Sequence, residues 1–152
     1  MAIFSALLFV SCSDDKDKSN IVSFPEMEQE ILLLVNDYRS SLDLSELSSH
    51  EVIKAQAYDH CRNMAEGTVE FSHEGFSDRC RLIGEEINYS YAAENVAKGQ
   101  NTAQAAFDDW IDSQGHRENI EGDFQLTGIS VVMNTQDSVY YYTHIFIQTS
   151  EQ

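Results

Sequence analysis

The chain has 152 residues, of which 42% are hydrophobic and 11% aromatic, enough for one domain with an apolar core. Its formal net charge of −17 argues against nucleic acid as a partner, because such a charge repels phosphate backbones. The same negative field attracts cations, so a metal partner remains open.

The first twelve residues, MAIFSALLFVSC, are almost all apolar and are followed at once by polar residues. They are too few to span a bilayer, which takes about 20 helical residues, so they indicate a targeting segment. The end of this segment, Phe9 to Cys12, resembles the lipobox of bacterial lipoproteins, in which the cysteine carries the lipid. The resemblance implies a membrane anchor at Cys12. Ser13-Asp14-Asp15 also resembles the acidic tag that sends some lipoproteins to the outer face of the outer membrane, so we expect an exported outer-membrane or cell-surface lipoprotein. A plain secretory signal or a disordered apolar tail is the alternative.

The sequence therefore predicts three parts: a signal segment at 1–12, a polar tether at 13–25 and a folded domain at 26–150. With Cys12 lipidated, Cys61 and Cys80 remain as a candidate disulfide. An exported location permits this bond, and it would add about 3 kcal/mol to the free energy of unfolding. Two buried free thiols are the alternative, because spacing cannot show whether the Cα atoms lie within bonding range.

Apolar residues at steps of three and four predict three helices. The first begins at Glu26. The second begins near Ser48, which has capping-box spacing to Glu51, and runs to Gly67. The third is capped by Asn101 or Thr102 and ends at Gly115. The expected buried faces are Met27, Ile31, Leu34, Val35, Tyr38 and Leu42 in the first helix, Ile53, Ala57, Cys61 and Met64 in the second, and Ala103, Ala106, Phe107 and Trp110 in the third.

The remaining segments are shorter. Residues 69–73 are too few to assign, residues 74–78 indicate a loop, and residues 79–87 favour one or two helical turns. Gln125–Met133 and Ser138–Gln148 are rich in β-branched and aromatic residues, with a turn at 134–137, which predicts a C-terminal hairpin. Helices followed by a hairpin favour a mixed sheet with helices packed on it.

Two of the five histidines stand in positions that favour a site. His50 and His60 lie in the second predicted helix and are expected to be ordinary helix residues, solvated or partly buried. His73 enters a loop, and His116 follows the glycine that ends the third helix. Loop positions held by rigid elements often carry function, although spacing alone singles out no ligand set.

A resemblance to a known family brings these positions together. The motifs FSHEG (71–75), AENVA (93–97) and WIDSQGHRENI (110–120) occur in this order, followed by FQLTGI and YYTHIF. Together they resemble the bacterial form of the CAP superfamily of cysteine-rich secretory, antigen 5 and pathogenesis-related class 1 proteins, over residues 26–148. The resemblance implies an α+β fold, a three-layer α-β-α sandwich around a central mixed, mainly antiparallel sheet. It also implies a cleft lined by two histidines and acidic residues.

By this resemblance the cleft residues are His73, Glu94 and His116. Many relatives have a second glutamate where this chain has Ser113, with Asp112 beside it, and the last strand has His144 where relatives often have glutamine. These three residues are candidate cleft neighbours. Two neutral imidazoles suit Zn²⁺ or another divalent cation, and a carboxylate either ligates the metal or fixes a histidine tautomer.

Three functions remain open at this point. The first is a surface-tethered binding module that takes a divalent metal or an extracellular lipid or protein ligand. The second is a metal-dependent hydrolase, protease-like, with Glu94 as base. The third is a structural envelope protein in which His73, Glu94 and His116 only tie loops to the sheet. No serine or cysteine nucleophile is identifiable beside a base, so the sequence favours a protein that is not an enzyme.

Overall fold

The structure is a computed structural model of the chain and describes residues 20–150. The predicted signal segment, its Cys12 and the first part of the tether lie outside the described residues. None of the helices within 20–150 combines the length and apolarity that a membrane-spanning segment needs.

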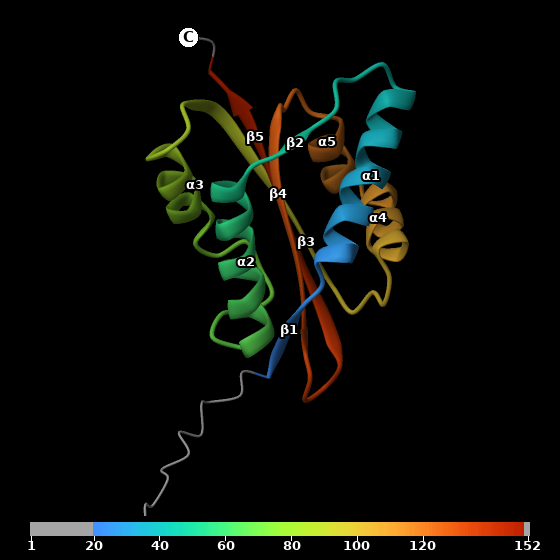
Figure 1. Cartoon of the computed structure of the whole chain (residues 1–152), viewed down its shortest axis with the longest axis vertical. Helices are drawn as coiled ribbons and strands as arrows, with labels where there is room; N and C mark the ends of the chain where they lie inside the picture. Colours follow the sequence, from blue (N-terminus) through green and yellow to red (C-terminus); the bar gives the residue numbers. More distant parts are fainter. Residues whose placement is uncertain (1–19, 151–152) are drawn as a thin grey trace, which may run out of the picture.

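A five-stranded sheet forms the middle of the fold (Figure 1). The strand order is β1-β4-β5-β3, and the short β2 pairs with β4 in parallel while every other pairing is antiparallel. The sheet is therefore mixed and mainly antiparallel, as predicted. The strands are β1 (Ile21–Ser23), β2 (Ser48–Ser49), β3 (Tyr89–Lys98), β4 (Leu126–Asn134) and β5 (Val139–Thr149).

Helices cover both faces of this sheet, which confirms the predicted α-β-α sandwich (Figure 1). One face carries α2 (Glu51–Glu66) and α3 (Phe76–Gly84), and the other carries α1 (Pro25–Ser41), α4 (Ala103–Asp112) and α5 (Gln114–Glu121). Successive side chains of a strand point to opposite faces, so β5 supplies both cores. Its Ile145 packs in the core under α2 and α3, and its Phe146 packs in the core under the other three helices.

The N-terminal boundary of the fold differs from the prediction. Ile21–Ser23, expected to belong to the tether, form β1 and pair with the end of β4. Phe24 N also donates to Val131 O. The sheet therefore begins at Ile21, before residue 26, where the sequence predicts the start of the domain.

The start of α2 also differs from the prediction, because Ser48 does not cap it. Ser48 and Ser49 are extended and pair with β4, and the helix cap is His50, whose Nδ1 accepts from Val52 N at 3.3 Å. The end of α2 is as predicted, since Gly67 adopts the left-handed conformation, with φ of 72°.

The third predicted helix is two helices. Ser113, with φ of −91° and ψ of 117°, interrupts the helical path, so α4 ends at Asp112 and α5 begins at Gln114. Gly115 lies inside α5 and does not end a helix. The break is tied by Arg117, whose Nη1 donates to Ile111 O at 2.6 Å at the end of α4.

The strand β3 has no counterpart in the sequence prediction, and α3 begins three residues earlier than expected, at Phe76. The inner half of β3 contains alanine, glutamate and asparagine, which have low strand propensity. Its pairing with β5 and its burial between the layers decide its conformation. The C-terminal hairpin is confirmed, with Asn134 opposite Val139.

Candidate functional site

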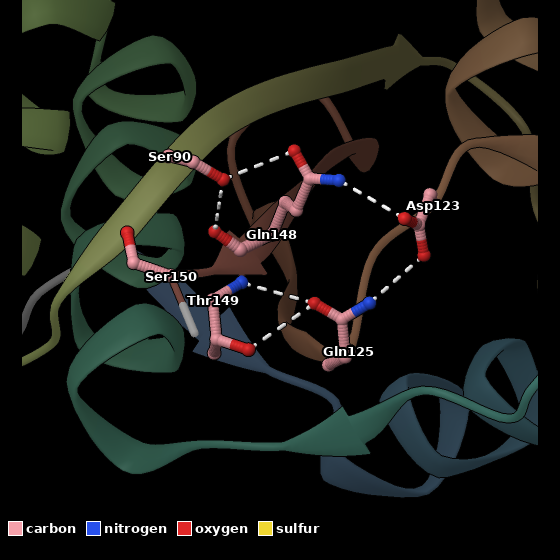
Figure 2. Close-up of a pocket in the computed structure, with 6 residues that line it drawn as sticks. All are labelled: Ser90, Asp123, Gln125, Gln148, Thr149 and Ser150. Carbon is pink, nitrogen blue, oxygen red and sulfur yellow. Dashed lines mark hydrogen bonds between the residues drawn. The ribbon is translucent and has the colours of Figure 1, made fainter. Parts of the chain in front are cut away.

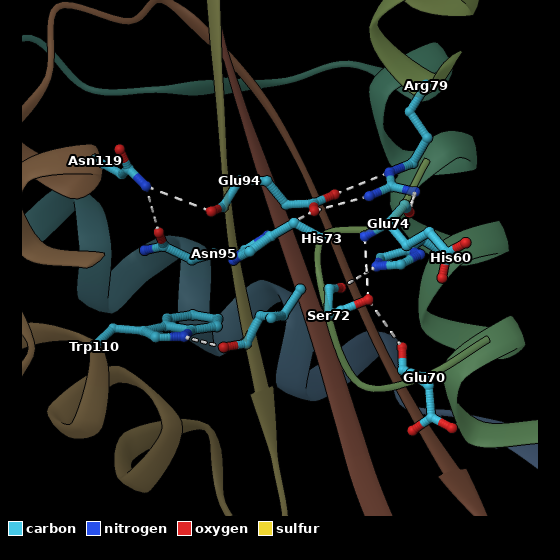
Figure 3. Close-up of polar contacts among 11 residues, drawn as sticks. His60, Glu70, Ser72, His73, Glu74, Arg79, Glu94, Asn95, Trp110 and Asn119 are labelled. Carbon is cyan, nitrogen blue, oxygen red and sulfur yellow. Dashed lines mark hydrogen bonds and ion pairs between the residues drawn. The ribbon is translucent and has the colours of Figure 1, made fainter. Parts of the chain in front are cut away.

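The edge strand β3 is the element on which the candidate site is built. β3 pairs with β5 on one side only, and side chains from α4 and α5 bind main-chain carbonyls along its other side (Figure 3). Trp110 Nε1 donates to Val96 O at 3.2 Å, and Asn119 Nδ2 donates to Glu94 O at 3.4 Å. These two side chains thus cover the outer edge of β3 at Glu94 and Val96.

The two central residues of β3 serve opposite layers. The side chain of Glu94 points toward α3, and the side chain of Asn95 points toward α5 (Figure 3). Asn95 is fully buried, and its Nδ2 donates to His116 O at 3.0 Å while its Oδ1 accepts from Asn119 Nδ2 at 2.8 Å. These bonds hold the first turn of α5, and with it His116, against β3.

The Glu94 carboxylate is 1% exposed and has both of its oxygens bonded (Figure 3). Arg79 donates to both: Nε to Oε2 at 2.9 Å and Nη2 to Oε1 at 2.8 Å. Oε1 also bonds His73 Nδ1 at 2.9 Å. Burial opposes ionisation, but the hydrogen bonds from His73 and Arg79 and the charge of Arg79 outweigh it, so the pKa of Glu94 is lowered. Glu94 is therefore an anion at neutral pH.

The bond to Glu94 fixes the tautomer and orientation of His73. An ionised carboxylate only accepts hydrogen bonds, so Nδ1 of His73 carries a proton. The His73 side chain is 50% exposed, and its Nε2 has no hydrogen-bond partner among residues 20–150. His73 thus presents Nε2 outward from a ring whose other nitrogen is held by a buried acid.

His116 approaches β3 from the opposite layer, on the first turn of α5. Burial lowers the pKa of His116, and the charge of a protonated His73 lowers it further. His116 is consequently neutral at pH 7. Its ring makes no hydrogen bond to the His73 and Glu94 pair in the described structure.

The three residues carried over from the family resemblance do not form a three-ligand cluster. Within residues 20–150, no group of three or more His, Cys, Asp or Glu side chains is placed to hold a metal ion. Direct ligation by Glu94 is disfavoured, because its side chain is 1% exposed and both of its oxygens already accept hydrogen bonds from Arg79 or His73.

The three candidate neighbours lie in different surroundings. Asp112 is exposed at the end of α4, and Ser113 is the residue at which α4 and α5 separate. His144 is fully buried and stacks on Phe146 at 3.9 Å, with Nε2 bonded to Thr127 Oγ1 at 2.8 Å. His144 is therefore a core residue and does not line an exposed cleft, because β5 places it on the inner layer beneath α4.

Arg79 and His60 belong to the site and were missed by the sequence analysis. His60, expected to be solvated or partly buried, is 3% exposed and holds the loop before His73 through a 2.8 Å bond from Nε2 to Ser72 O. Burial, and then the charge of Arg79, lower the pKa of His60. The signal for Arg79 lies in its spacing, three residues after Phe76 and four before Ile83, on the buried face of α3. A buried arginine needs a buried anion.

The two cysteines of the folded part are free thiols. Cys61 is fully buried and donates from Sγ to Tyr141 O at 3.0 Å, whereas Cys80 is half-buried on α3. Burial raises the pKa of Cys61 to about 12. The structure therefore has two free thiols at Cys61 and Cys80 and no disulfide between them.

Two Bacillus subtilis proteins are similar to this chain in sequence. The uncharacterized protein YkwD is 31% identical over 98 residues, which cover 61% of this chain and 37% of that protein. The uncharacterized membrane protein YlbC is 30% identical over 125 residues, which cover 80% of this chain and 34% of that protein. The chain thus spans little more than a third of the length of either relative.

Three solved structures are similar in fold. An outer surface protein of Borrelia burgdorferi has a TM-score of 0.74 at 16% identity, over 86% of this chain and 98% of that one. A cysteine-rich secretory protein of Staphylococcus aureus has a TM-score of 0.67 at 21% identity, over 82% of this chain and 39% of that one. An extracellular protein of Bacillus anthracis that contains an SCP domain has a TM-score of 0.68 at 28% identity, over 82% of this chain and 41% of that one.

The family model described as CAP, the cysteine-rich secretory protein family, matches residues 32–146, which run from α1 to the middle of β5 and include His73, Glu94 and His116. The chain belongs to the CAP family.

Proposed function

We propose that this chain is an exported CAP-domain binding module that holds a divalent cation, Zn²⁺ in the first instance, between the imidazoles of His73 and His116. The observation that carries the proposal is the bond from His73 Nδ1 to the buried Glu94. In metal sites a carboxylate in this position fixes the ring and raises the basicity of the ligating nitrogen. In this proposal Glu94 orients the ring of His73 and does not itself ligate the metal.

The donor set suits a borderline metal such as Zn²⁺. The neutral state of His116 leaves an imidazole lone pair for a metal, and His73 presents Nε2 outward. Imidazole nitrogen is a preferred ligand of zinc, copper and nickel. With two protein ligands, water or an extracellular ligand would complete the coordination, so the metal would act as a bridge to that ligand.

The same geometry gives less support to hydrolysis. A general base needs a free lone pair directed at substrate or at water, and the oxygens of Glu94 face Arg79 and His73. Ser72, next to His73, donates its hydroxyl to Glu70 O and not to an imidazole. We therefore favour binding over catalysis for this site.

The proposed location outside the cytoplasm has two supports. The solved relatives are named as an outer surface protein, a secretory protein and an extracellular protein. The apolar segment that ends at Cys12 is the expected export signal and lipid anchor. A Cys12→Ser variant expressed in a bacterial host should lose both metabolic labelling with palmitate and recovery in the membrane fraction. Unchanged labelling in that variant would exclude Cys12 as the anchor.

The metal site is tested by isothermal titration with zinc chloride. The native protein should bind about one zinc per chain, and His73→Ala and His116→Ala should each abolish the heat. His50→Asn is the matched control, since it removes a histidine outside the site and keeps a side chain that caps α2. Absence of binding to the native protein, or binding that survives both alanine variants, would refute the proposal.

A further variant separates an orienting role of Glu94 from ligation. Glu94→Gln keeps an oxygen that can accept from His73 but removes the charge. Loss of an orienting partner lowers metal affinity by about 10- to 100-fold. Complete loss of binding in a folded Glu94→Gln protein, checked by circular dichroism, would instead make Glu94 a ligand.

A further inference from the structure

A polar pocket lies at the end of the sheet where β5 ends and β3 begins. Its volume is about 610 Å³, within the range of small-molecule sites. Three separate segments contribute to it: the start of β3, the turn before β4 and the end of β5. The lining residues, which form a ring around the opening in Figure 2, are Ser90, Asp123, Gln125, Gln148, Thr149 and Ser150.

Hydrogen bonds within this ring fix its side chains (Figure 2). Asp123 accepts from two carboxamides, at Oδ1 from Gln125 Nε2 and at Oδ2 from Gln148 Nε2, both at 3.0 Å. Gln125 Oε1 accepts from Thr149 N at 3.0 Å, and Gln148 Oε1 accepts from Ser90 Oγ at 3.0 Å. The orientation of both carboxamides is therefore set before any ligand arrives, which reduces the entropy lost on binding.

The ring keeps hydrogen-bonding capacity for a ligand. Each carboxamide nitrogen has two hydrogens and uses one on Asp123, and each oxygen of Asp123 has two lone pairs and accepts one bond from a carboxamide. Donors and acceptors thus alternate within a few ångströms. A hydroxyl group, which donates and accepts at once, matches this alternation.

The charge of the pocket narrows the class of ligand. Among residues 20–150, no lysine or arginine lines the pocket, and the carboxylate of Asp123 repels anions. Asp123 is the single carboxylate among the lining residues, whereas a hard metal cation requires several oxygen ligands. The lining thus favours a neutral ligand rich in hydroxyl groups over a phosphate, a carboxylate or a metal ion.

An exposed aromatic ring stands beside the polar ring. Tyr91 is 60% exposed and is the cross-strand partner of Gln148. It stacks on Phe124, with ring centroids 5.9 Å apart and planes at 18°, and Phe124 lies between Asp123 and Gln125 in the chain. A large exposed ring held in place by a second ring offers a flat apolar surface at small entropic cost.

We propose that this pocket binds a neutral saccharide, with Asp123, Gln125 and Gln148 on its hydroxyl groups and Tyr91 against the apolar face of a sugar ring. A sugar presents hydroxyl groups at its edges and C–H groups on its faces. It can therefore bind the polar side chains of the pocket and the ring of Tyr91 at the same time. The site is separate from the one proposed for zinc. Ser90 precedes Glu94 by four residues along β3, which corresponds to roughly 13 Å of extended strand.

The probes are cellobiose, maltose and N,N′-diacetylchitobiose, each titrated into ¹⁵N-labelled protein. At least one should shift the side-chain amide signals of Gln125 and Gln148 in a saturable way. Asp123→Asn and Tyr91→Ala should each raise the Kd by at least about tenfold, the effect of losing one hydrogen bond to a charged group or one stacking contact.

The matched control is Asp108→Asn, because Asp108 also accepts from a carboxamide, Gln104 Nε2 at 2.8 Å, on the exposed face of α4. This variant should bind the sugar with an unchanged Kd. The proposal is overturned if none of the three sugars shifts the pocket signals, or if both pocket variants bind as tightly as the native protein. A stronger, saturable response to glycylglycine would likewise overturn it and assign the pocket to peptides.

Discussion

Asn95 of β3 and His116 of α5 are joined by a 3.0 Å hydrogen bond from the side-chain Nδ2 of Asn95 to the main-chain oxygen of His116. The other end of the same carboxamide accepts from Asn119. Because Glu94 precedes Asn95 on the strand, adjacent residues of β3 fix His73 on one side and His116 on the other. The site therefore depends on the edge strand more than on the loop that carries His73 or the helix that carries His116.

Replacing Asn95 by leucine should loosen α5 from the sheet. The change removes the hydrogen bond to His116 O and one of the two acceptors of Asn119 Nδ2, at a cost of about 0.5–1.5 kcal/mol per lost hydrogen bond. We expect the free energy of unfolding, measured by urea denaturation, to fall by this order and zinc affinity to fall with it. Gln104→Leu, an exposed change on α4, should alter stability by less than about 0.5 kcal/mol. Equal stability of the two variants would show that the Asn95 bonds do not hold α5.

Arg79→Met should be far more damaging than Arg81→Met. Arg79 is the buried partner of both Glu94 oxygens, and removing one member of a buried ion pair costs about 3–5 kcal/mol. Arg81 makes an exposed pair with Glu85 on the same helix, worth about 0.3–0.5 kcal/mol. Urea denaturation of the two variants measures this difference.

The same pair of variants tests the electrostatics of Glu94. Burial raises the pKa of Glu94, and the guanidinium of Arg79 counteracts this effect. Without Arg79 the pKa of Glu94 should therefore rise. The ¹³C shift of the Glu94 carboxyl, followed against pH, reports this directly. A Glu94 pKa that stays the same in Arg79→Met and Arg81→Met would contradict the role given to Arg79.

The layered fold and most helix faces could be predicted from sequence because they depend on local periodicity. Ile53, Ala57 and Cys61 recur at steps of four, and all three are fully buried on α2. The hairpin of β4 and β5 was predictable for a similar reason, since its residues have high strand propensity.

The elements that build the site were harder to predict because long-range contacts decide them. Strand β3 is set by pairing with β5, and Ser48 forms a strand with β4 although its local spacing favours a helix cap. The helix break at Ser113 carries no proline or glycine at that position. Only the family resemblance named His73, Glu94 and His116 as site residues. It does not reveal that Arg79 donates hydrogen bonds to both oxygens of Glu94.

Stability should fall as the pH drops below neutrality, and His144 should be one cause. Burial, and then the charge of Arg39, lower the pKa of His144 from 6.5 to about 3. Between these values the unfolded chain binds a proton that the folded chain does not. The free energy of unfolding therefore falls with decreasing pH, by up to about 1.4 kcal/mol per pH unit. His60 and His116, whose pKa values are also lowered, act in the same direction.

His144→Gln removes the contribution of one histidine from this slope. Urea denaturation at pH 7, 6 and 5 should show a smaller loss of stability in the variant than in the native protein, by about 2 kcal/mol at pH 5. Measurements at pH 5 and above avoid most of the titration of Glu94, whose stabilising effect is lost as the pH falls below 4.5. Parallel slopes in the two proteins would show that folding does not lower the pKa of His144.

Cys61 should be unreactive in the folded protein. Its thiol is fully buried, donates to Tyr141 O and has a pKa raised by burial to about 12, so very little thiolate forms at pH 8. Treatment with iodoacetamide followed by peptide mass spectrometry should modify Cys80 first and Cys61 only when urea is added. Mapping by peptide separates both from Cys12. Modification of Cys61 at the rate of Cys80 without urea, or a peptide linking the two in a non-reducing digest, would contradict the free, buried thiol.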